Sequence, residues 1–232
     1  MIFHHSLSFK SVLMLAALVS YTLSSASIAG GVSLGATRVI YPAETRQISL
    51  MVNNSDDKSR FLIQSWIEDL NGKKNNDFSV TPPLFMIGPE KENTLRISFN
   101  RLRGLPSDRE ILYWFNAQAI PQQDTEKGQN VLQLASLSRI KMFVRPSGLQ
   151  MKSIDAPNHI RFSTQSGMLT IHNPSPYYVT LVNFKVGDTF QPNTMVAPKD
   201  TVTLKSNGNG DITFSTINDY GAITPIQKGV MK

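Results

Sequence analysis

Hydrophobic and polar residues alternate in a stretch near the middle of the chain, residues 130–146. Every second position carries an apolar side chain or a serine, in the order Leu132, Leu134, Ser136, Ser138, Ile140, Met142 and Val144. A period of two indicates a β-strand, because successive side chains point to opposite faces of a sheet. Ordinary strands reach roughly ten residues at most. The segment therefore predicts a strand longer than the core of one sandwich requires.

The remaining hydrophobic positions form short runs rich in β-branched and aromatic residues, separated by polar turn-forming stretches. Examples are RQISLMVNN, RFLIQSWIED, ILYWFNAQAIP, MLTIHN and YYVTLVNFKV, with turn candidates such as NGKKNND and SNGNGD between runs. None of the runs has a convincing helical period. This pattern predicts an all-β protein with two β-sandwiches in tandem. The boundary is expected near the sequence RPSGLQ, which gives domains over residues 30–147 and 148–232.

The N-terminus has the pattern of a secretory signal peptide. Lys10 precedes an apolar run over residues 12–19, and Ser27 and Ala29 form the small pair expected before a cleavage site. The run is shorter than the roughly 20 residues that span a bilayer, so we expect no stable membrane insertion. We therefore expect residues 1–29 to be removed on export, with cleavage after Ala29 or Gly30. The chain has no cysteine, so the exported fold must be stabilised by core burial without disulfides.

Composition argues against several classes of function. The 232-residue chain carries 23 basic and 17 acidic residues, a mild excess with no dense lysine or arginine block, so nucleic-acid binding is not expected. The two histidines beyond the signal peptide, His159 and His172, lack metal-ligand spacing, and no glycine-rich phosphate loop is present. The sequence therefore predicts no enzyme, no metal site and no cofactor.

Two basic residues stand out from the strand patterns. Arg38 interrupts the apolar phase of GVSLGATRVIYP, where a buried charge would need a partner. Alternatively, the strand bends near Gly35 and Arg38 simply reaches the surface. Lys141, between Ile140 and Met142, would by itself be an ordinary solvated side chain.

Several motifs in order along the mature chain resemble one known family. They are GVSLGATRVIYP, FLIQSWIED, VTPPLF, ENTLRI, LPSDREILYWFNAQAIP, LQLASLSRIKMFVRP, NPSPYYVT and INDYGA. Together they are similar to the periplasmic pilus chaperones of the chaperone-usher pathway, most closely those of type 1 fimbriae. The resemblance implies two immunoglobulin-like β-sandwich domains in an L-shaped, or boomerang, arrangement. It also implies a periplasmic protein that folds and caps pilus subunits and delivers them to an outer-membrane usher.

The resemblance assigns roles to particular residues. Arg38 and Lys141 match the pair of cations that grips the C-terminal carboxylate of the subunit. The first half of the long strand matches the donor that fills the subunit's open groove, through Asn130, Leu132, Leu134 and Ser136. Ser136 departs from the family, which usually has a large apolar residue at that position. The second half, from Ile140 to Val144, is expected to belong to the protein's own sheet.

The resemblance also implies a salt bridge between the two domains. Arg145 and Asp219 match two of its members. A third, acidic member aligns with Gly88, which leaves the network incomplete unless Glu90 substitutes for it.

Two other classes of exported β-protein remain as alternatives. A pilus subunit would share the export signal, but such subunits typically carry a disulfide, and this chain has no cysteine. A carbohydrate-binding sandwich would need an exposed aromatic platform. Trp66 and Trp114 lie inside apolar strand patterns and are expected in the core.

Overall fold

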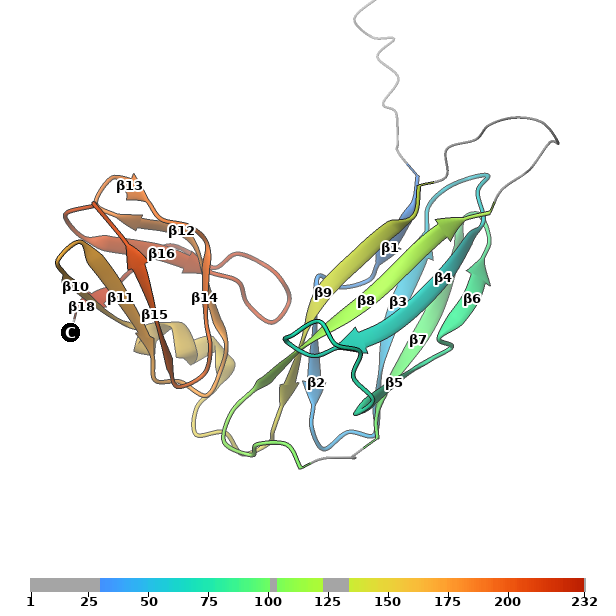
Figure 1. Ribbon diagram of the computed structural model, residues 1–232, viewed down its shortest axis with the longest axis horizontal. Helices are drawn as coiled ribbons and strands as arrows, with labels where there is room; N and C mark the ends of the chain where they lie inside the picture. Colours follow the sequence, from blue (N-terminus) through green and yellow to red (C-terminus); the bar gives the residue numbers. More distant parts are fainter. Residues whose placement is uncertain (1–29, 101–103, 123–133, 232) are drawn as a thin grey trace, which may run out of the picture. The chain divides into compact units, whose positions relative to one another are not determined.

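The computed structural model describes residues 30–100, 104–122 and 134–231 (Figure 1). The proposed signal peptide and the proposed donor residues Asn130 and Leu132 lie outside these ranges. In the described part the regular structure is almost entirely strand, and one 3-10 turn, η1 (Ser153–His159), is the exception. The predicted all-β class is confirmed. No helix in the described ranges is long and apolar enough to cross a membrane.

The first half of the chain forms one sandwich of two sheets. The four-stranded sheet has the order β1-β3-β7-β5, with β1 (Val32–Leu34), β3 (Gln47–Asn54), β7 (Lys91–Phe99) and β5 (Phe78–Thr81). The five-stranded sheet has the order β2-β9-β8-β4-β6, with β2 (Arg38–Pro42), β9 (Ser136–Arg145), β8 (Ile111–Pro121), β4 (Phe61–Glu68) and β6 (Leu84–Ile87). All neighbours pair antiparallel except β2 and β9, which run parallel.

Both sheets contribute to the core of the first sandwich. Val52, Phe115, Met142 and Val144 are fully buried in it. The fully buried Tyr41 donates its hydroxyl hydrogen to the carbonyl of Thr45 and accepts from the amide of Phe99, each at 3.1 Å. The burial of Met142 and Val144 confirms the predicted phase for the second half of β9. We call the opposite side of the five-stranded sheet, which faces away from this core, the outer face.

The second half of the chain forms another sandwich. One sheet has the order β15-β11-β10-β18, with β15 (Asp200–Lys205), β11 (Met168–Asn173), β10 (Arg161–Gln165) and β18 (Val230–Met231). The other has the order β13-β12-β16-β17, with β13 (Thr189–Phe190), β12 (Val179–Val186), β16 (Ile212–Thr216) and β17 (Gln227–Lys228), and β14 (Thr194–Val196) also pairs with β12. Phe162, Phe184 and Phe214 fill the core between these sheets.

The two edges of β9 are paired over different lengths. On one side, β8 pairs with β9 from Ser136 to Val144. On the other side, β2 pairs only from Lys141 to Arg145. Within the described residues, the segment from Ser136 to Ile140 therefore has an unpaired backbone edge. Unpaired edges of this kind readily accept another strand.

Candidate functional site

Arg38 and Lys141 lie side by side where the unpaired edge of β9 ends. Arg38 opens β2 and is the Cα partner of Lys141 in the parallel pair. The chain leaves one sheet after Leu34 and enters the other at Arg38, so it bends near Gly35, as one of the two sequence interpretations proposed. Val39 points into the core, and Arg38 projects half-buried on the outer face.

Neither cation has a carboxylate partner within ion-pair distance among the described residues. Arg38 Nη1 donates to the carbonyl of Ile217 at 3.2 Å, and its buried Nε has no hydrogen-bond partner in the described part of the chain. Lys141 Nζ donates to Met195 Sδ at 3.2 Å, and a thioether is only a weak acceptor. Burial lowers the pKa of both groups, and the nearby charge of Arg38 lowers that of Lys141 further. The pair therefore favours an incoming anion.

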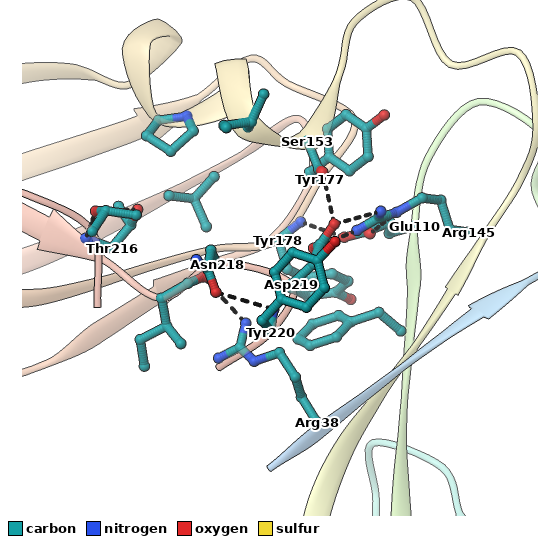
Figure 2. Close-up of a pocket in the computed structure, with 16 residues that line it drawn as sticks. Arg38, Glu110, Arg145, Ser153, Tyr177, Tyr178, Thr216, Asn218, Asp219 and Tyr220 are labelled. Carbon is teal, nitrogen blue, oxygen red and sulfur yellow. Dashed lines mark hydrogen bonds and ion pairs between the residues drawn. The ribbon is translucent and has the colours of Figure 1, made fainter. Parts of the chain in front are cut away.

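A cavity of about 130 Å³ borders Arg38 (Figure 2). Phe143, Tyr177 and Ile217 are among the apolar groups that line it. The loop after β16 forms part of its wall, and this loop is folded tightly because Asn218 Oδ1 accepts from two backbone amides at 3.0 Å each. Gly221 in this loop has a φ of +84°, and a side chain there would collide with Thr37 Oγ1.

Arg145 and Asp219 are joined by two hydrogen bonds of 2.8 Å, as Figure 2 shows. A third charged group completes the cluster, because Arg145 Nε donates to Glu110 Oε1 at 2.7 Å. Ser153 donates its hydroxyl hydrogen to Asp219 at 2.8 Å, and Glu110 accepts from the amide of Tyr178 at 2.9 Å. Arg145 comes from the first sandwich and Asp219 from the second, so the cluster links the two.

Sequence reasoning missed Glu110, which is the acid that completes the cluster. The residues considered for this role, Gly88 and Glu90, lie elsewhere: the carbonyl of Gly88 accepts from Asn54, and Glu90 forms none of the ion pairs in the described ranges. The one sequence feature that could have indicated Glu110 is its position as a charged residue directly before the apolar run ILYWFNAQAIP. Glu110 is 3% exposed, and burial raises its pKa against the opposing effect of Arg145.

We expect the contribution of Asp219 to stability to disappear in acid. Burial acts to raise the pKa of Asp219, but the hydrogen bonds and charge of Arg145 outweigh it, so the pKa lies below its ordinary value. A lowered carboxyl pKa stabilises the fold above the unfolded-state pKa, and this stability is lost as pH falls through the folded-state pKa. Asp219→Asn should lower the unfolding free energy by about 1–3 kcal/mol at neutral pH. Urea unfolding at neutral and strongly acidic pH measures this, and a constant difference would contradict it.

The described donor residues are exposed. Leu134 is 73% exposed, and Ser136 is exposed at the unpaired edge of β9. Sequence reasoning overlooked Leu137, which lies on the outer face of the same edge and is 55% exposed. Two large apolar side chains therefore flank this edge, one in each phase of the alternation.

The expectation that Trp66 and Trp114 belong to the core is wrong. Their strand neighbours Ile67 and Phe115 point into the core, so both tryptophans project from the outer face, where they are half-buried. Trp66 Nε1 donates to Glu68 Oε1 at 2.7 Å. An apolar strand pattern does not by itself identify which of its two faces is covered.

Comparison with known proteins gives consistent matches over both sandwiches. Residues 31–150 match the family model described as "Pili and flagellar-assembly chaperone, PapD N-terminal domain". Residues 155–228 match "Pili assembly chaperone PapD, C-terminal domain". The chaperone protein FocC of Escherichia coli is 51% identical over 206 residues, covering 87% of this chain and 91% of FocC. The chaperone protein FimC of Escherichia coli K12 is 48% identical over 205 residues, covering 87% and 85%.

Solved structures agree with these matches. The periplasmic chaperone SfaE is 48% identical with a TM-score of 0.77, and the match covers 86% of this chain and all 100% of SfaE. The chaperone SafB, solved in complex with the Salmonella enterica pilin SafA, is 29% identical with a TM-score of 0.76, covering 88% and 98%. The predicted pair of immunoglobulin-like domains is confirmed.

Proposed function

Because the chain belongs to the family of pilus-assembly chaperones, we propose that it folds and caps pilus subunits by donating the first half of its long strand, with Asn130, Leu132, Leu134 and Ser136, to the subunit's open groove. The C-terminal strand of the captured subunit then pairs with the unpaired edge of β9. Its Arg38 and Lys141 bind the C-terminal carboxylate of the captured subunit. Residues 1–29 direct export to the periplasm and are removed there, leaving domains over residues 30–147 and 148–232. From the periplasm the protein delivers subunits to an outer-membrane usher.

The observation that carries this proposal is that two cations without carboxylate partners in the described ranges lie at the end of an unpaired strand edge. The edge from Ser136 to Ile140 offers backbone donors and acceptors to an added strand. Arg38 and Lys141, at the next level, offer two charges without carboxylate partners in the described ranges. An added strand can pair with these backbone groups, and the carboxylate of a chain terminus can pair with the two cations.

The geometry also sets the direction of the captured strand. Beyond Lys141 the edge of β9 is occupied by β2. A strand whose C-terminus lies at Lys141 must therefore extend back along Ile140 towards Ser136, so its terminus points the same way as β9. The captured strand is accordingly parallel to β9.

The alternating side chains of β9 and of the segment before it have different roles in this proposal. Met142 and Val144 fill the protein's own core. Leu134 on the same phase, with Leu132 before it, is free to fill the groove of a subunit that lacks a strand. A fully buried leucine contributes roughly 1.5–3 kcal/mol. The serines at positions 136 and 138 contribute little bulk, so backbone pairing and the two leucines carry most of the donation.

The proposal is tested by shifting the position of the subunit's C-terminal carboxylate. Two residues added to the C-terminus of a co-expressed cognate pilus subunit shift the carboxylate by about 6–7 Å along the strand. We expect recovery of the complex to fall by at least roughly tenfold, because losing one partner of a charge pair costs about 2–5 kcal/mol.

The control is the same subunit with two residues added at its N-terminus, which leaves the carboxylate in place. Full recovery of the C-terminally extended subunit would show that the terminus is not recognised, and the proposal would fail.

A further inference from the structure

Both tryptophans of the chain lie on the outer face close to Lys141. Trp114 on β8 is the cross-strand partner of Lys141, whose Nζ lies 6.0 Å from the centre of the indole ring. Trp66 lies one strand further along, on β4. Large aromatic groups that are half-buried beside a binding edge call for a reason beyond core packing.

A guanidinium covers one of these rings. Arg139 Cζ lies 4.5 Å from the centre of the Trp114 ring. Arg139 also forms a 3.0 Å ion pair with Glu68, and Glu68 in turn accepts the indole hydrogen of Trp66. The Arg139 guanidinium is thus held against Trp114 with its charge balanced, and its side chain is still 41% exposed. We call Trp114, Arg139 and Glu68 the stacking platform.

The stacking platform adjoins the unpaired edge. Arg139 precedes Lys141 by two positions, so both side chains project from the outer face. In the parallel arrangement proposed above, the level of Lys141 is taken by Arg38, and the nearest open level for a captured chain's last residue is that of Ile140. The second-to-last residue then lies level with Arg139. Side chains at one level of neighbouring strands project from the same face, so this side chain meets the stacking platform.

We infer that the stacking platform selects an aromatic side chain at the second-to-last position of the captured chain. The inference rests on the proposed capture of a C-terminal strand. A guanidinium already lying on one ring can stack a second ring on its other side. Glu68 already balances the charge of Arg139, so an acidic side chain at this position gains little and approaches a carboxylate. An aliphatic side chain fits the space without the stacking contribution.

The test uses synthetic peptides of about ten residues, alternating valine and threonine with two N-terminal lysines for solubility. They have a free C-terminal carboxylate and differ only in the second-to-last residue, which is tyrosine, leucine or glutamate. With the full chain, we expect the tyrosine peptide to bind roughly five- to tenfold more tightly than the leucine peptide, and the glutamate peptide to bind most weakly. The tyrosine peptide should also change the tryptophan fluorescence most, because both indoles lie at the site.

Two variants separate the stacking platform from a general effect on the edge. Arg139→Lys keeps the charge and Arg139→Gln keeps a planar amide, but neither has a guanidinium. In both, the preference for tyrosine over leucine should fall to about twofold or less, with leucine-peptide affinity little changed. Equal binding of the tyrosine and leucine peptides to the unaltered protein, or strongest binding of the glutamate peptide, would overturn the inference without relying on any variant.

Peptides with an amidated C-terminus distinguish failure of this inference from failure of the proposed function. If amidated and free-acid peptides bind equally, the carboxylate is not recognised and the proposed function fails. If the free acids bind more tightly but the second-to-last residue has no effect, the stacking platform alone is refuted. Free-acid preference together with tyrosine preference supports both.

Discussion

Replacing Arg38 or Lys141 with alanine is expected to abolish subunit capture while leaving the protein folded. Each cation is half-buried without a carboxylate partner in the described residues, so removing it relieves an unfavourable desolvated charge in the free protein. In the complex, the same change leaves the subunit's carboxylate with half of its site. The expected loss is about 2–5 kcal/mol of binding free energy. Recovery of a co-expressed subunit, together with thermal melting of each variant alone, measures both effects.

The matched control is Lys228→Ala. Lys228 is a surface lysine whose side chain is 82% exposed and whose nearest acid lies 3.4 Å away. This change lowers the net charge by the same amount and should leave capture intact. If the Arg38 and Lys141 variants yield as much complex as the unaltered protein, these two cations do not bind the subunit's carboxylate. Variants that fail to fold would show instead that the two cations support the free structure.

Introducing aspartate at Leu134 should block capture without harming the free protein, whereas aspartate at Val144 should unfold it. Leu134 lies two residues before β9 and is 73% exposed, so a charge there costs the isolated chain little. Val144 is fully buried in the first core, where a large-to-small change alone commonly costs about 2–5 kcal/mol and a buried charge costs more. Melting temperature and protection of a co-expressed subunit from proteolysis separate the two effects.

Leu70→Asp serves as the control for adding a charge at an exposed leucine. Leu70 lies in the turn after β4, is 57% exposed, and should tolerate the change in both assays. If Leu134→Asp melts as early as Val144→Asp, the first half of the strand belongs to the protein's own core and does not act as a donor. Ser136→Ile probes the space in the subunit groove: stronger capture would indicate room there, and weaker capture would indicate that the groove is already filled.

The strand architecture could be predicted because alternation is a local property. The phase that buries Met142 and Val144 can be read directly from residues 130–146. The division into two sandwiches can be read from the two sets of strand runs on either side of RPSGLQ. The same rule failed for Trp66 and Trp114, whose strands are apolar on both faces. Alternation assigns two residues to opposite faces, but which face packs against a second sheet depends on strands far away in the sequence.

The charged groups of the site were predictable only in part. Arg38 stood out because a charge interrupted an apolar phase, but its position opposite Lys141 depends on the parallel register of β2 and β9. Glu110 was missed because its partner Arg145 lies on the next strand and Asp219 lies in the other sandwich. Pairing across such distances leaves no local pattern in the sequence.

The start of β2 at Arg38 closes the edge of β9 immediately beyond Ile140. A strand that pairs with this edge parallel to β9 cannot continue straight along β9 past Ile140, because β2 occupies the edge from Lys141 onward. Under the proposed capture, the client chain ends at this level. The C-terminal residue is the last part of a secreted protein to leave the translocation channel. If the protein holds its clients by their free carboxylate at this edge, as proposed, it engages only chains whose translocation is complete.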